Sequence, residues 1–110
     1  MKINDESIQL IVRFEVGGGK EYYDRFLKSP TWSGEYSGVT IGVGYDLGYN
    51  SANTVQADWQ NDLNSETIGR LTVCCGKKGK NEALKILSKV KDIIIPWTAA
   101  YQWFGQFFKF

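Results

Sequence analysis

The sequence predicts a single α+β domain in which helices dominate. Apolar residues recur at helical spacing near the N-terminus and again after residue 48, whereas residues 37–45 alternate with a period of two around several glycines. A chain of 110 residues can bury one modest hydrophobic core. A hydrophobic content of 43%, of which aromatic residues are a large part, excludes intrinsic disorder.

The first predicted helix spans residues 4–15 and stops at the glycines of residues 17–19, which do not support a helix. Ile8 and Ile11 lie on one apolar face of this helix, and Glu15 ends the same face. A carboxyl group held against an apolar face loses hydration, so its pKa rises and it can act as a general acid near neutral pH. The alternative is a solvated glutamate at a frayed helix end.

A small β-element of one or two short strands is predicted within residues 31–45, after an irregular or weakly helical stretch at residues 20–30. Gly42 and Gly44 alternate with Val43, so both glycines are expected to face one side of a strand. Their missing side chains would allow a ligand or the first helix to approach closely, and bulky replacements should not be tolerated.

Three to four helices are predicted after this element. Ser51 and Ser65 are the expected N-caps of two of them, Asn81 starts a third, and Pro96 occupies the first position of the last. Residues 76–79 are expected to form a mobile basic loop between them. The residues expected to face inward are Val55, Trp59, Leu63, Ile68, Leu71, Ala83, Leu84, Leu87 and Val90.

The last fourteen residues are unusually aromatic. Phe104 and Phe108 follow helical spacing and can fill the core of the domain, together with Ala100. Trp103, Phe107 and Phe110 are expected to project from a neighbouring strip that a short chain has little left to cover. The strip predicts burial against a partner surface, most simply a second copy of the chain, which would give a homo-oligomer.

Composition excludes several classes of function. The net charge of +1 excludes a strongly basic nucleic-acid interface, and the absence of histidine excludes Ser-His-Asp and Cys-His catalysis. Cys74 and Cys75 are adjacent, which suits neither a disulfide scaffold nor a four-ligand zinc site, so both are expected to be reduced, structural thiols. We expect no metal and no cofactor.

The N-terminus is polar and lacks the apolar run of a signal peptide, so none is expected, and the sequence has no run of 18 apolar residues that could span a membrane. The chain is therefore expected to be made in the cytoplasm. An action outside the cytoplasm would require delivery by another factor.

Three acidic residues are candidates for a second catalytic carboxylate: Asp24, Glu35 and Asp46. Glycoside hydrolysis needs two carboxyl groups and neither metal nor histidine, which matches this chain. The alternatives are structural. Asp46 can cap the turn at Leu47 by an Asx-type hydrogen bond, and Asp24 can be a surface charge.

Aromatic side chains gather in sequence around the glycine-rich segment, and sugars bind aromatic faces through their C–H groups. The candidate ligand-binding residues are Trp32, Tyr36, Tyr45 and Asp46. Ordinary core packing is the alternative for each ring.

Residues 37–49 (SGVTIGVGYDLGY) resemble the glycine-rich β-element of phage-type lysozymes and pesticin-like muramidases. In that family a glutamate ends the first helix, and a threonine stands in a Thr-Ile-Gly-X-Gly segment, which Glu15 and Thr40 match. The resemblance is strongest in this segment and weaker over residues 8–103. Tyr45 and Asp46 follow the Gly-X-Gly, where the family commonly has histidine, so Asp46 is a candidate for a functional residue of a subgroup.

The resemblance implies a lysozyme-like fold and a bacteriolytic hydrolase that cleaves the β-1,4 glycan of peptidoglycan. Glu15 would protonate the leaving oxygen, Asp24 or Asp46 would stabilise the developing charge or orient water, and Thr40 would help to place that water. The family carries a further C-terminal helical lobe, which residues 1–110 are expected to lack. The alternatives are a non-catalytic lysozyme-like binding module and a fragment that associates through its aromatic C-terminus.

Overall fold

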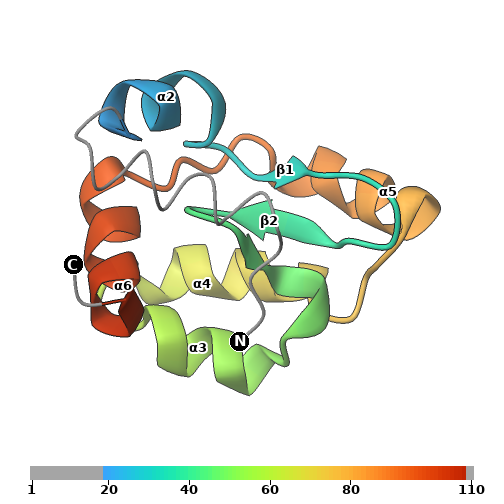
Figure 1. Cartoon of the computed structure of the whole chain (residues 1–110). Helices are drawn as coiled ribbons and strands as arrows, with labels where there is room; N and C mark the ends of the chain where they lie inside the picture. The colour runs from blue at the N-terminus through green and yellow to red at the C-terminus, as the bar shows by residue number, and fades with distance from the viewer. Residues whose placement is uncertain (1–18, 109–110) are drawn as a thin grey trace.

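The computed structural model describes residues 19–108 (Figure 1). Within this range the predicted helix-dominant α+β class is confirmed. The helices are α2 (Gly19–Phe26), α3 (Ala52–Trp59), α4 (Ser65–Leu71), α5 (Lys80–Val90) and α6 (Trp97–Phe108), with 3₁₀ turns η1 (Leu47–Tyr49) and η2 (Thr72–Cys74). The strands are β1 (Thr31–Trp32), β2 (Val39–Ile41) and β3 (Tyr45–Asp46). The predicted helix at residues 4–15 lies outside the described residues.

The three strands form one antiparallel sheet in the order β1-β2-β3. Thr40 pairs with Asp46, and Ile41 pairs with Tyr45, so residues 42–44 form the turn between β2 and β3. The prediction that Gly42 and Gly44 share one side of a strand is therefore wrong. Both have a positive φ, of +58° and +84°, which glycine adopts without the steric cost that a side chain would bring.

The core lies between the sheet and the helices. In Figure 1, α3 and α4 lie below the strands, while α6 lies between α2 and α3 at the left. The rings of Trp59 on α3 and Trp103 on α6 stack with centroids 5.1 Å apart, and Tyr45 on β3 packs edge-on against both. This group of three rings joins the sheet to two helices. Other fully buried side chains are Tyr23, Val39, Ile41, Leu47, Ile68, Leu71, Ile95 and Phe104.

The predicted helix starts are partly confirmed. Ser51 caps α3 through its side chain, as expected. Ser65 does not cap α4, because the side chain of Asn64 accepts the hydrogen bond and Ser65 becomes the first helical residue. Helix α5 begins at Lys80, one residue before Asn81, and its N-cap position has no side-chain hydrogen bond.

The expected inward faces of the central helices are mostly confirmed. Leu63 and Leu87 pack at the margin of the core. Leu84 is exposed, which corrects its predicted inward position. It follows the buried Ala83 by one residue, and successive helical side chains point about 100° apart. The fully buried members of the predicted set are Val55, Trp59, Ile68, Leu71, Ala83 and Val90.

Helix α6 does not place Trp103 on an outer strip. Trp103 is fully buried together with Ala100 and Phe104, because the spacing i, i+3, i+4 brings all three to one helix face. The prediction that Trp103 projects toward a partner is therefore wrong. The side chains of Phe107 and Phe110 lie outside the described residues. None of the helices described is long and apolar enough to cross a membrane.

Residues 76–79 are bound to the β-element and do not form a separate loop. The amide of Gly76 donates to the carbonyl oxygen of Gly48 (3.2 Å), the amide of Gly79 donates to Ser37 (3.0 Å), and Lys78 forms a β-bridge with Gly38. The expectation of a mobile linker is corrected, since three contacts hold this segment against the sheet.

Gly38 and Gly48 allow this close packing. A Cβ atom on Gly38 would lie 2.6 Å from the Cα atom of Gly48, and one on Gly48 would lie 2.6 Å from the carbonyl oxygen of Lys77. Both obstructing atoms belong to the backbone and cannot rotate away. The approach of these segments therefore requires glycine at both positions.

We predict that Gly38→Ala lowers the free energy of unfolding by about 1–3 kcal/mol, because the added methyl group must displace backbone. Gly69→Ala is the matched control: Gly69 lies within α4, and a Cβ atom there would meet nothing within 4 Å. This control should raise stability by about 0.5–1 kcal/mol. Urea unfolding measures both values. Equal stability of Gly38→Ala and wild type would contradict the packing argument.

Candidate functional site

The carboxylate of Asp46 lies at the junction of the β-element and residues 76–79. Its Oδ1 accepts hydrogen bonds from the amides of Gly48 (2.9 Å) and Gly38 (3.1 Å), and its Oδ2 lies 3.1 Å from the same Gly38 nitrogen. The side chain is only 5% exposed. The sequence-based alternative of an Asx-type cap is confirmed, since Asp46 is the N-cap of η1.

Burial raises the pKa of Asp46 above its ordinary value of 3.8, whereas the two glycine amides and the Lys78 ammonium act in the opposite direction. Desolvation is the larger effect. The group is therefore a partly dehydrated carboxyl with fixed hydrogen-bond donors on one side, which is a common environment for acid–base residues.

Thr40 lies directly across the hairpin from Asp46. Directly opposed residues of an antiparallel pair share one face of the sheet, so Thr40 and Asp46 point to the same side. Thr40 is 8% exposed, and its buried Oγ1 makes no hydrogen bond within the part of the chain that the structure describes. A buried hydroxyl without a partner commonly binds water or a ligand group. The sheet thus brings together two of the predicted site residues.

Tyr45 occupies the opposite face of β3 and is fully buried. Its hydroxyl donates to Oδ2 of Asp58 (2.6 Å), and its ring packs against Trp59 and Trp103. Burial and the Asp58 hydrogen bond raise the pKa of Tyr45 far above its ordinary value. The ring has no exposed face on which a sugar could stack, so the prediction of a ligand-binding Tyr45 is corrected: it is a core residue.

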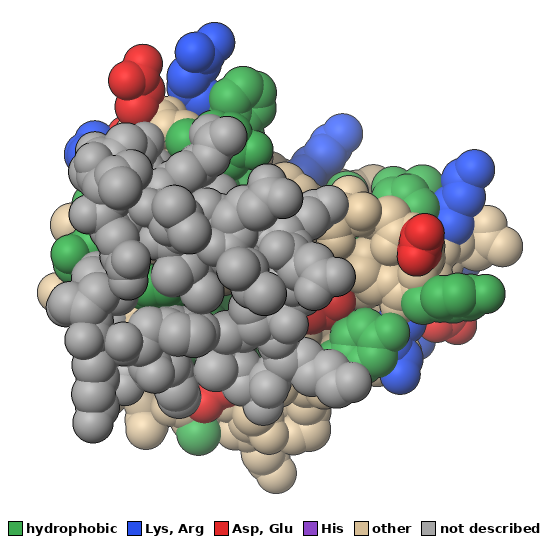
Figure 2. All heavy atoms as spheres, in the orientation of Figure 1, with side chains coloured by type: hydrophobic (Ala, Val, Ile, Leu, Met, Phe, Trp, Pro, Cys, Tyr) green, Lys and Arg blue, Asp and Glu red, His purple; other side chains and the backbone are tan. Residues whose placement is uncertain are grey.

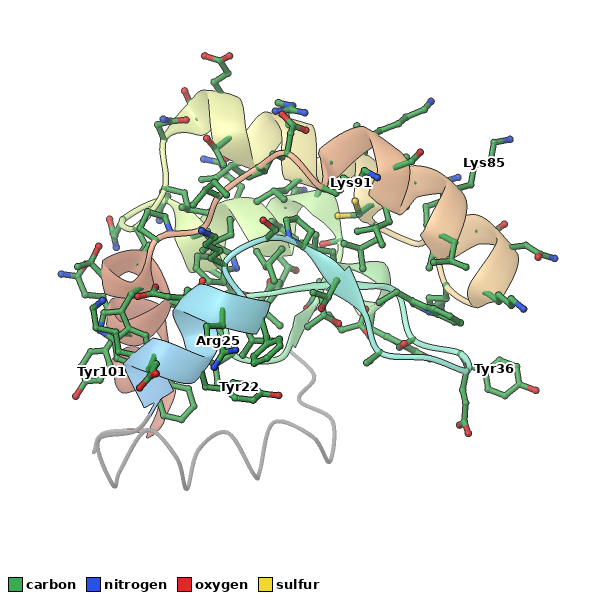
Figure 3. All side chains as sticks on the ribbon, turned by 90° about the horizontal axis from the view of Figure 1, so that it is seen from above. Tyr22, Arg25, Tyr36, Lys85, Lys91 and Tyr101 are labelled. Carbon is green, nitrogen blue, oxygen red and sulfur yellow. The ribbon has the colours of Figure 1, made fainter. Side chains whose placement is uncertain are left out.

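The two other predicted ligand-binding rings lie at the β1–β2 hairpin. Trp32 is half-buried, and its Nε1 donates to the carbonyl oxygen of Ser37 (3.0 Å). Tyr36 is 80% exposed and projects from the end of the loop, as Figure 3 shows. Glu35 beside it has a positive φ of 54°, an unusual conformation for a residue with a side chain.

Asp24 lies on α2 and pairs with Lys20 one helical turn earlier (2.7 Å). Both side chains are largely exposed. The surface-charge alternative for Asp24 is confirmed, although its partner is Lys20 rather than Arg25 or Lys28. Glu15, the predicted general acid, lies outside the described residues.

Lys78 is a neighbour of this site that sequence reasoning did not identify. Its Nζ lies 4.6 Å from the centroid of the Tyr49 ring, and its charge acts on Asp46. Lys78 is separated from Asp46 by 32 positions, and the packing of residues 76–79 against the β-element brings it close. A run of two lysines between glycines gave no signal for this contact.

Residues 19–108 contain no group of three or more His, Cys, Asp or Glu side chains that could hold a metal ion. Cys74 and Cys75 are free, and burial raises the pKa of the Cys74 thiol to about 11. Cys74 is therefore protonated near neutral pH and packs as a small apolar side chain.

We predict that Asp46→Ala lowers the free energy of unfolding by about 2–4 kcal/mol, because it leaves the buried amides of Gly38 and Gly48 without an acceptor. Asp46→Asn keeps one oxygen as an acceptor for these donors and should cost less than half as much. Urea unfolding followed by tryptophan fluorescence measures both. Equal losses for the two variants would contradict the role of the oxygen as acceptor.

The raised pKa of Asp46 predicts a specific pH dependence. Between pH 3.8, where the unfolded side chain loses its proton, and the higher pKa of the folded state, the folded protein binds more protons. The stability of wild type relative to Asp46→Asn should therefore fall as pH rises through this window. Parallel urea unfolding of both proteins over this range measures the difference. A relative stability that increases with pH would exclude a raised pKa.

Comparison with known proteins gives a family but no activity. A family model described as a domain of unknown function, DUF8812, matches residues 11–109. No match was found among curated proteins or among solved structures. Because the family model covers most of the sequence, including the β-element and the described helices, the chain belongs to the DUF8812 family.

Proposed function

We propose that the protein is a lysozyme-like hydrolase of the β-1,4 glycan strands of peptidoglycan, with a Glu15 general acid and with Thr40 and Asp46 at its β-element. The observation that carries the proposal is the cross-strand pair of Thr40 and Asp46. The two side chains share one face of the sheet. The Thr40 hydroxyl has no partner in the described region, and the Asp46 carboxyl is partly dehydrated, so together they suit the placement of a water molecule. The resemblance of residues 37–49 to phage-type lysozymes supports the same reading.

In the proposed reaction the Glu15 carboxyl gives its proton to the glycosidic oxygen as the C–O bond breaks. Positive charge then develops on the sugar ring, and a second carboxylate stabilises it or orients the attacking water. The water oxygen bonds to the anomeric carbon, and its proton passes to that carboxylate or back to the Glu15 carboxylate. The Thr40 hydroxyl donates one hydrogen bond to that water or accepts one from it. No cofactor takes part in this chemistry.

Asp46 is favoured over Asp24 and Glu35 as the second carboxylate. Asp24 is an exposed surface charge paired with Lys20, and Glu35 is exposed at the end of a loop. Asp46 alone of the three is buried beside Thr40. Its fixed position is the property that a catalytic carboxylate requires.

A non-catalytic module that binds glycan without cleaving it is the second candidate. One observation favours it: both oxygens of Asp46 already accept hydrogen bonds from backbone amides, as a purely structural aspartate would. In both candidates the ligand is the glycan strand of peptidoglycan. The proposal also includes delivery of the protein to the cell wall by another factor. It further includes self-association through Phe107 and Phe110.

Hydrolysis of purified peptidoglycan tests the proposal. Glu15→Gln should reduce the rate by about 10²- to 10⁴-fold, because the amide cannot supply the proton. Glu21→Gln is the matched control, since Glu21 is an exposed glutamate on α2, and it should retain the wild-type rate. Release of reducing sugar ends gives the rate.

Equal activity of wild type and Glu15→Gln would overturn the assigned acid. A wild type that binds glycan strands and releases no reducing ends would instead establish the second candidate.

A further inference from the structure

The charges of this protein are divided unevenly along the chain. Six of the 13 basic residues and only one of the 12 acidic residues lie within residues 77–91, so this segment carries a net charge of +5 and the rest of the chain carries −4. The whole-chain value of +1 is the sum of these two unlike parts. We infer that the basic segment, centred on α5, docks on an anionic phospholipid bilayer, with its lysines at the lipid headgroups and Leu84 entering the interface.

The lysines of the basic segment are all exposed. They are Lys77, Lys78, Lys80, Lys85, Lys89 and Lys91. The ion pairs among residues 19–108 join Lys20 to Asp24 and Arg70 to Asp92, so none of the six lysines is paired with an acidic side chain of this range. Lys78 lies over the Tyr49 ring. In Figure 2, basic side chains project at the upper right, where Figure 1 places α5.

An acidic residue at the end of α5 is already compensated. The two carboxylate oxygens of Asp92 accept hydrogen bonds from Nη1 (3.0 Å) and Nη2 (2.8 Å) of Arg70 on α4. Nη2 also donates to the carbonyl oxygen of Lys89 (3.1 Å), which ties the end of α5 to α4. Because Arg70 neutralises Asp92, and Glu82 is the one acidic residue within residues 77–91, the positive charge of the segment is largely uncompensated.

Helix α5 turns one side to solvent. Ala83 and Val90 are buried against the domain, and the helical rotation of about 100° per residue turns Lys85 and Ser88 to the opposite, outer side. Figure 3 shows Lys85 pointing away from the body of the protein. Leu84 lies at the edge of this outer side and is 40% exposed. An apolar side chain is therefore presented beside the lysines.

Exposed aliphatic side chains gather near the same lysines. Among the described residues, the large apolar side chains that are exposed are either aromatic or one of three aliphatic residues, Val73, Leu84 and Ile94. Val73 belongs to η2, which packs against α5, and Ile94 lies four residues beyond the end of α5. Lysines combined with exposed aliphatic groups suit an anionic bilayer, because ammonium groups are attracted to the lipid phosphates and apolar side chains enter the interface.

A nucleic acid fits this surface less well than a bilayer does. Residues 77–91 contain neither an aromatic residue nor an arginine. Surfaces that bind nucleic acids commonly stack bases on aromatic rings and hold phosphates with the paired N–H groups of arginine. Arg70, on the neighbouring helix, is already held by Asp92. A negatively charged bilayer needs no such fixed geometry, since it attracts each nearby lysine.

Co-sedimentation of the full chain with lipid vesicles tests the inference. One set of vesicles contains equal parts of phosphatidylglycerol and phosphatidylcholine, and the other contains phosphatidylcholine alone. Wild type should bind the anionic vesicles and not the neutral ones. Binding should weaken at high ionic strength, because salt screens the charges. Binding of a short DNA duplex is measured in parallel by fluorescence anisotropy.

The double variant Lys85→Gln, Lys89→Gln should weaken binding to anionic vesicles by about 10- to 30-fold, because each lysine near such a surface contributes about fivefold. The matched control is the double variant Lys20→Gln, Arg25→Gln. It removes the same charge from exposed positions of α2, on the other side of the molecule from α5 in Figure 1, and should weaken binding by less than about threefold. Leu84→Gln, which leaves the charge unchanged, should weaken binding by about threefold.

The inference is overturned if wild type binds both kinds of vesicle alike or binds neither, if the two double variants lose binding equally, or if Leu84→Gln binds as tightly as wild type. Tighter binding of the DNA duplex than of anionic vesicles, lost in the Lys85→Gln, Lys89→Gln variant, would instead make this surface a nucleic-acid interface. None of these outcomes depends on glycan hydrolysis, so the inference is tested independently of the proposed function.

Discussion

The carboxylate of Asp46 holds together the part of the fold that carries the candidate site. It accepts hydrogen bonds from the amides of Gly38, before β2, and Gly48, after β3. The glycines lie so close that neither tolerates a Cβ atom, and residues 76–79 pack directly against them. A buried carboxylate is stable only when its oxygens have such partners, so the local backbone and this side chain depend on each other.

The two faces of the short sheet have different roles: one packs on the core, and the other carries the polar groups of the candidate site. Ile41 and Tyr45 point to the core, where Tyr45 packs with Trp59 and Trp103, and they fix the hairpin to α3 and α6. Thr40 and Asp46 point to the other face and supply the polar groups. Tyr45, which the sequence suggests as a ligand-binding ring, is therefore a structural residue. Its neighbour Asp46 is the candidate for chemistry.

Local signals in the sequence predicted the fold class well. Periodicity identified α3 to α6, and Ser51 marked the start of α3, because caps and amphipathic faces depend on neighbouring residues. Predictions failed where the outcome depends on distant contacts. The alternation of glycine and valine at residues 42–44 predicted a strand. Because Ile41 pairs with Tyr45, these three residues form a turn instead. Lys78 was missed because the packing of residues 76–79 on Gly38 and Gly48, which are distant in sequence, brings it to Asp46.

The most direct test of this account is a pH titration of the amide proton shifts of Gly38 and Gly48 by nuclear magnetic resonance. Both amides donate to one carboxyl group, so we expect the two shifts to change together with a single midpoint above 3.8, the ordinary pKa of aspartate. The Asp46→Asn variant should lose this transition at both positions. Shifts that titrate with different midpoints, or that do not titrate in wild type, would contradict the central role of the Asp46 carboxylate.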